Sequence, residues 1–102
     1  MKGNGTLFNT AGSSSIGEVD SKTKVTGAHS IPMQGTSNSV TQLYDNNGNL
    51  VQERYYGEDG NAYLDIDYSD HGNPKTHPTV PHQHHITWQD GEPHRGRGEA
   101  VS

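Results

Sequence analysis

Histidine is concentrated in one short part of this sequence. Six of the seven histidines lie between His71 and His94, and three of them fall within the tetrapeptide His82-Gln83-His84-His85. Histidine is the side chain whose ordinary pKa lies closest to neutral pH, so it transfers protons or binds metal ions with little tuning. Packing alone does not require so many imidazoles in so short a span. We therefore expect the chemistry of this chain between Asp67 and Trp88.

One interpretation of this tract is a metal site. On a strand, His82 and His84 project to the same side about 7 Å apart, and imidazole nitrogens bind transition metals at about 2 Å. His71, His77 or Asp67 would complete a shell of nitrogen and oxygen ligands for a divalent ion such as zinc, nickel or manganese. This interpretation predicts a metal-dependent nuclease or hydrolase.

The other interpretation, which we favour, is RNA cleavage by acid–base catalysis without a metal or any other cofactor. One group must take the proton of the ribose 2′-hydroxyl, another must protonate the leaving 5′-oxygen, and a cation must stabilise the charge that develops on the phosphate. Two histidines would fill the first two roles, and Lys75 or Arg54 the third. Asp70 or Asp67 would orient an imidazole. The structural alternative is a polar strand whose exposed histidines have no chemical role.

The composition limits both the core and the partners. Only 26% of the residues are hydrophobic and the mean hydropathy is -0.99, so part of the chain should be loose or ordered by a partner. The absence of cysteine excludes disulfides and cysteine-based zinc sites, and no membrane span or signal peptide is recognisable. A net charge of -5 argues against nucleic-acid binding over the whole surface. Residues 71–102, however, carry three Lys/Arg against three Asp/Glu, so an anionic substrate is repelled least there.

The elements that must position these groups are strands. Residues 39–44 and 50–56 flank Asp45-Asn46-Asn47-Gly48, a strong tight-turn signal, and a third strand over 62–68 follows a second turn at 57–60. Because side chains alternate along a strand, the third strand should have an aliphatic core face and a carboxylate face open to solvent or to a site. The first face would carry Ala62, Leu64, Ile66 and Tyr68, and the second Tyr63, Asp65 and Asp67.

A fourth strand is predicted over 82–88, after a loop rich in proline. It should place His82, His84, Ile86 and Trp88 on one side. We expect a mainly β fold, a small curved antiparallel meander sheet of about four strands. The expected organisation is an irregular Gly/Ser/Thr-rich arm over 1–35, with one or two short strands as the alternative there, the sheet domain with its His-rich loop and strand over 36–90, and a flexible tail over 91–102. In that tail, Arg95 and Arg97 could contact an anionic partner.

Three motifs within residues 42–88 resemble a known family. The order R-Y-Y-x-x-D-G, D-I-D-Y-S-D-H-G and P-H-x-H is similar to that of the C-terminal toxin domains of bacterial polymorphic toxin systems. Those domains are the variable tips of Rhs-type and contact-dependent inhibition proteins, and similar modules occur beside phage structural genes. The polar residues that match by position are Arg54, Asp65, Asp67, Asp70, His71, His82 and His84.

The resemblance covers less than half of the chain and implies a small nuclease toxin, in the first place an RNase. It implies a curved antiparallel sheet with one or two N-terminal helices, which would make the fold α+β. Within the acid–base interpretation, His82 and His71 are the expected proton-transfer pair, His84 is a further candidate, and Arg54 or Lys75 is the expected phosphate-contacting cation.

The resemblance also implies partners and a location. The expected partners are an RNA substrate and a cognate immunity protein, without a membrane. The chain would be cytoplasmic where it is made, and either encoded by a phage or delivered to the cytoplasm of a target cell as part of a larger protein. A third hypothesis is a non-enzymatic phage or shell component whose histidines serve assembly, because a low hydrophobic content suits a protein that completes its core by oligomerisation.

Overall fold

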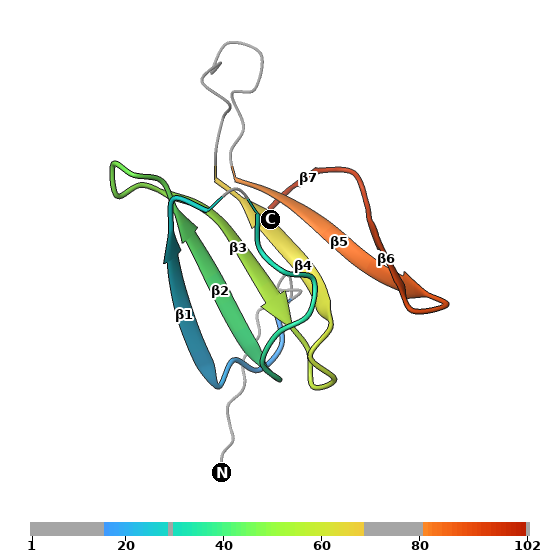
Figure 1. Ribbon diagram of the computed structural model, residues 1–102. Coiled ribbons are helices and arrows are strands. Elements are labelled where there is room, and N and C mark those ends of the chain that lie inside the picture. Colours follow the sequence, from blue (N-terminus) through green and yellow to red (C-terminus); the bar gives the residue numbers. More distant parts are fainter. Residues whose placement is uncertain (1–15, 29, 69–80, 102) are drawn as a thin grey trace.

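The computed structural model describes residues 16–28, 30–68 and 81–101, and these form one mainly β structure (Figure 1). The described residues contain no helix, and hence none long and apolar enough to cross a membrane. The mainly β prediction is confirmed, but the estimate of about four strands is too low. The strands are β1 (Ser21–Thr26), β2 (Ser39–Tyr44), β3 (Leu50–Tyr56), β4 (Ala62–Asp67), β5 (His82–Gln89), β6 (Glu92–Arg95) and β7 (Glu99–Ala100).

The strands lie in the order β1-β2-β3-β4-β5-β6, and β7 pairs with β5. The pairs β2–β3, β3–β4 and β4–β5 are antiparallel, as the meander prediction requires. The β2–β3 turn is held by Asp45, whose carboxylate accepts the backbone N–H groups of Asn47 and Asn49. These hydrogen bonds lower the pKa of Asp45, and the bond from the backbone of Asn49 has the largest effect. Gly48 completes the turn at a φ of 86°, a conformation that favours glycine.

The structure contains a strand, β1, within the segment 1–35 that was expected to be an irregular arm. β1 pairs with β2 in parallel, so the chain must return from the end of β1 to the start of β2. The returning segment passes across one face of the sheet, over β3 and β4 (Figure 1). Residues 30–38 of this segment are called the crossover, and the face that they cover is called the crossover face. Parallel pairing depends on this long connection and not on a tight turn, which explains why local sequence signals allowed a short strand in this region but did not locate β1 or its partner.

Backbone and side-chain contacts fasten the crossover to the sheet. Met33 O accepts the N–H of Ala62 at 2.9 Å, and Gly35 N–H donates to Gly60 O at 2.8 Å. The hydroxyl of Tyr56 donates to Pro32 O at 2.6 Å. The crossover is therefore a second layer that closes the core on this side.

Each face of the sheet carries its own apolar cluster. On the crossover face the buried members are Ile31, Leu43, Tyr56, Ala62 and Ile86, and Val25, Met33 and Trp88 pack against them. On the opposite face the buried members are Val40, Tyr55, Leu64 and Ile66, with Tyr63 and Tyr68 against them. The few apolar side chains are thus concentrated on the central strands, and buried polar side chains complete the interior around them.

The predicted faces of the third strand need two corrections. The register shifts between Tyr55 and Tyr56, so that these residues face Leu64 and Ala62. Such a bulge moves one residue to the other side of a strand, and Ala62 therefore belongs to the crossover face. The expected open carboxylate face is also wrong at Asp65, which is 0% exposed.

The opposite face contains a buried carboxylate, Glu53. It accepts hydrogen bonds from Gln42 Nε2 at 2.7 Å, from the Tyr68 hydroxyl at 2.7 Å and from the Tyr55 hydroxyl at 3.1 Å. Burial and the neighbouring carboxylate raise the pKa of both phenols. Three neutral donors thus offset the cost of burying this charge.

The C-terminal part also differs from the expected flexible tail over 91–102, because it contains β6 and β7. Strands β5 and β6 form a hairpin through Asp90 and Gly91, whose φ angles are 55° and 77°. Two successive positive φ angles define the hairpin turn that Asp-Gly sequences favour. β5 pairs with β4 through residues 82–85 and with β6 through residues 86–89. The strand therefore passes from one partner to the other midway along its length.

Two glycine substitutions test the attachment of the crossover. Gly60 and Gly48 both have positive φ, so Gly60→Ala and Gly48→Ala share a similar backbone strain. A Cβ at Gly60 would lie 2.7 Å from Gly35 O, whereas a Cβ at Gly48 would meet nothing within 4 Å. We expect Gly60→Ala to lower the free energy of unfolding by about 1–3 kcal/mol more than Gly48→Ala, as measured by urea denaturation. Equal losses of unfolding free energy in the two variants would show that Gly35 in the crossover is not packed closely against Gly60.

Candidate functional site

Polar side chains form two cross-strand rows on the crossover face. In one row, Arg54 on β3 lies opposite Asp65 on β4, and Asp65 lies opposite His84 on β5. In the next row, Asp67 lies between Gln52 and His82. Opposed residues have Cβ atoms about 4.5–5.5 Å apart. The sheet therefore brings two of the predicted histidines beside two of the predicted aspartates.

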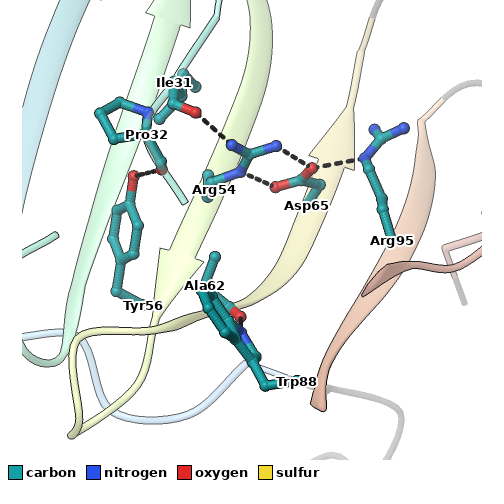
Figure 2. A network of polar contacts seen from close by, with 8 residues as sticks. All are labelled: Ile31, Pro32, Arg54, Tyr56, Ala62, Asp65, Trp88 and Arg95. Atoms are coloured by element: carbon teal, nitrogen blue, oxygen red, sulfur yellow. Dashed lines mark hydrogen bonds and ion pairs between the residues drawn. The ribbon is translucent and has the colours of Figure 1, made fainter. Parts of the chain in front are cut away.

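Arg54 and Asp65 form a buried bidentate ion pair (Figure 2). Arg54 Nε and Nη2 donate to the two carboxylate oxygens at 2.6 and 2.7 Å, and Nη1 donates to Ile31 O in the crossover. The two residues are 6% and 0% exposed. Each nitrogen of this guanidinium thus donates a hydrogen bond inside the protein. Arg54, one of the two cations predicted to contact phosphate, lies within the core of the described structure.

Arg95 binds the same carboxylate from β6. Its Nε donates to Asp65 Oδ2 at 2.8 Å, and 37% of its side chain is exposed. Within the described residues no hydrogen bond engages its two Nη groups, which point away from Asp65 in Figure 2. One buried carboxylate therefore holds two guanidiniums, one inside the core and one at its surface.

The ring of His84 is held in a defined orientation. Its Nδ1 lies 2.9 Å from Gly96 O in the segment between β6 and β7. A carbonyl oxygen only accepts hydrogen bonds, so Nδ1 carries the proton and Nε2 has the free lone pair when the ring is neutral. A Cβ at Gly98 would lie 3.3 Å from Nε2 and 3.1 Å from Cε1. Gly96 thus holds one nitrogen of the ring, and the lack of a side chain at Gly98 leaves space beside the other nitrogen.

His82 lies on the same side of β5, half-buried and opposite Asp67. His85 projects to the other side, where its Nε2 lies 3.9 Å from Glu99 Oε1. Both partners of that pair are about half exposed, so it contributes little to stability. As predicted, His82 and His84 lie on one side of the strand and His85 on the other. Ile86 and Trp88 lie further along the strand on the side of His82 and His84, where they pack in the core.

Several predicted site residues lie outside the described residues. These are Asp70, His71, Lys75 and His77. The candidate metal ligands were His82, His84, His71 and Asp67. Within the described part of the chain, no group of three or more His, Cys, Asp or Glu residues is placed to hold a metal ion. Because His71 lies outside this part, the metal site stays a prediction.

Sequence reasoning missed the contribution of β6 and of the segment after it. The sequence indicates Arg95 only as one of two arginines in a tail, and no motif points to Gly96 or Gly98. The signal that could have located them is Asp90-Gly91, a two-residue hairpin turn. Extending the strand pattern across that turn would have placed Arg95 beside the histidine strand.

The network predicts an unequal effect for one substitution at two sites. Asp65→Asn removes the charge that faces two arginines and leaves Arg54 buried without its counter-ion, which should lower the free energy of unfolding by about 3–5 kcal/mol. Asp90→Asn makes the same change at an exposed turn and should alter it by less than about 0.5 kcal/mol. Urea denaturation of both variants measures the difference. Similar stabilities would mean that the buried pair is not important for the fold.

Comparisons of the chain with protein-family models, curated proteins and solved structures find no significant match.

Proposed function

We propose that this chain cleaves RNA by histidine acid–base catalysis, as a nuclease toxin domain of the polymorphic type. The observation that supports the proposal most is the geometry of His84. Its Nδ1–H is bound to Gly96 O, so its Nε2 is available to exchange a proton. A ring bound through one nitrogen keeps its orientation in both charge states, since Nδ1 is a donor in the imidazole and in the imidazolium.

The reaction requires two proton transfers on opposite sides of a phosphate. A neutral imidazole takes the proton of the 2′-hydroxyl, and the 2′-oxygen forms a bond to phosphorus. The bond from phosphorus to the 5′-oxygen breaks, and an imidazolium supplies the proton that this oxygen needs. The products are a 2′,3′-cyclic phosphate and a free 5′-hydroxyl, so no water or metal ion is consumed in this step.

His82 and His84 are the described residues best placed for these roles. Their backbone positions lie on one side of β5 about 7 Å apart, a spacing at which two imidazoles can contact the same phosphate. Asp67 lies opposite His82 and supplies a carboxylate beside it. His71 is the alternative partner of His82 and lies outside the described residues, so its role is decided by substitution.

The decisive experiment is a cleavage assay with the purified chain and a short RNA in excess EDTA. We expect a cyclic phosphate product, and we expect His84→Ala and His82→Ala each to lower the rate by a factor of about 10²–10⁴. His85→Ala is the control, because this ring is on the same strand but faces the other side. A single 2′-deoxy nucleotide at the cut site should abolish cleavage there.

Three other results would contradict the proposal in different ways. Activity that is lost in EDTA and restored by zinc, nickel or manganese would favour the metal-dependent hydrolase. Full activity in His84→Ala would exclude this ring from the reaction. Stable oligomers without activity on RNA, in a protein that does not arrest bacterial growth, would favour the assembly role.

The close approach of Gly98 gives a second test of the same ring. An alanine methyl at this position would lie 3.3 Å from His84 Nε2, which is tight enough to shift or cover that nitrogen. We expect Gly98→Ala to lower the cleavage rate by about tenfold or more while the folded structure persists, because even a small misplacement of a catalytic group is costly. The control is Gly57→Ala, where a Cβ would meet no atom closer than 3.5 Å. Equal activity of both variants would mean that Nε2 of His84 does not act.

A further inference from the structure

We propose that Arg95 forms an oxyanion subsite that binds a phosphodiester group of the substrate, with Asp65 as the residue that positions it. The inference rests on the proposed function, but it assigns the cation that the reaction needs to a residue other than the two predicted from the sequence. Lys75 lies outside the described residues. Arg54 is 6% exposed and bonded through every nitrogen.

The first support is the balance of charge. The carboxylate of Asp65 is already paired through both oxygens with Arg54. Arg95 adds a second positive charge to the same carboxylate, so the cluster of these residues carries one excess positive charge. Because one guanidinium already pairs with both oxygens, the buried carboxylate does not require this second cation. The excess charge at the surface of the cluster is suited to binding an anion.

The second support is the orientation of the guanidinium. Its Nε is fixed on Asp65 Oδ2 at 2.8 Å, and Figure 2 shows both Nη groups directed away from the carboxylate. Two parallel N–H donors of one guanidinium match two oxygens of a phosphate. Fixing the third nitrogen removes much of the entropy that a long side chain loses on binding. The arginine is therefore pre-organised for bidentate recognition of a phosphate.

The third support is the position of Arg95 relative to the histidines. Arg95 lies opposite Ile86 on β5 and reaches Asp65 on β4. Asp65 is the register partner of His84, and His84 precedes Ile86 by two residues on the same side of β5. The arginine side chain thus reaches across β5 to Asp65 at the level of His84 and Ile86. A phosphate on its Nη groups would lie beside the proposed proton-transfer groups, with Asp67 and His82 in the adjoining row.

Binding is tested separately from cleavage with a short RNA whose 2′-hydroxyls are all methylated, so that it cannot react. Isothermal titration calorimetry would compare the wild-type chain with Arg95→Gln, Arg95→Lys and Arg97→Gln. We expect Arg95→Gln to weaken binding by about tenfold or more and to lower the slope of log affinity against log salt by about 1. Arg97→Gln, which removes the same charge two residues away, should have a clearly smaller effect. Arg95→Lys keeps the charge but loses the paired N–H donors of the guanidinium, so its affinity should lie between those of Arg95→Gln and the wild type.

The outcomes for the subsite and for the catalytic proposal differ. Weak binding by Arg95→Gln together with normal cleavage by His84→Ala would support the subsite and reject the role of His84. Normal binding by a folded Arg95→Gln variant, or a loss no larger than that of Arg97→Gln, would overturn the subsite whatever the histidine variants do. If Arg95→Gln is unfolded by circular dichroism, Arg95→Lys decides, and affinity equal to that of the wild type would overturn bidentate recognition. Failure of the wild-type chain to bind the methylated RNA would also overturn the subsite.

Discussion

The buried carboxylate of Asp65 is the constraint on which the rest of the structure depends. A charge with 0% exposure is tolerated only when it is paired and hydrogen-bonded. Arg54 supplies that partner from the directly opposite position on β3. A slip of one residue would move every side chain of the slipped strand to the other face, so a slip of β3 alone would leave Arg54 among Val40, Leu64 and Ile66 and would leave Asp65 without its partner. The ion pair therefore selects the register of the central strands, in addition to any stability that it contributes.

The same carboxylate connects elements that are distant in the sequence. Through Arg54 it is linked to Ile31 O in the crossover, and through Arg95 it is linked to β6. These contacts meet near the place where β5 leaves β4 and pairs with β6 instead. Beyond this point Trp88 still connects β5 to β4, because its ring nitrogen donates to Ala62 O at 2.7 Å. The candidate site is thus built on strands that are tied together by buried contacts, which favours the fixed orientations that proton transfer needs.

The sequence was sufficient for the features that are determined locally. The turn at Asp45–Gly48 and the alternation after it located β2, β3 and β4, and the alternation in β5 placed His82 and His84 together. The remaining features depend on non-local pairing. Nothing near Ser21–Thr26 indicates a parallel partner, and β6 contains almost no apolar residue, so hydrophobic periodicity could not detect either strand. The burial of Arg54 follows from its pairing with Asp65, which is defined only by the register of the folded strands. No local sequence pattern indicates the bulge that places Ala62 on the crossover face.

The overall negative charge of the chain and an RNA substrate are compatible because of where the charges lie. Glu53 is buried on the face opposite His82 and His84, and Asp65 is neutralised by two arginines. Asp45 and Asp59 lie in turns beyond the two ends of β3. Interactions between exposed charges are largely screened beyond about 10 Å at 0.1 M salt, so a phosphate on the crossover face responds mainly to its immediate neighbours. Within the described residues, those neighbours are the excess positive charge at Arg95, the imidazoles of His82 and His84, and a single carboxylate, Asp67, in the adjoining row. An acidic protein can therefore present a locally cationic site, and its acidity elsewhere would limit the contact with RNA to a short segment of the strand.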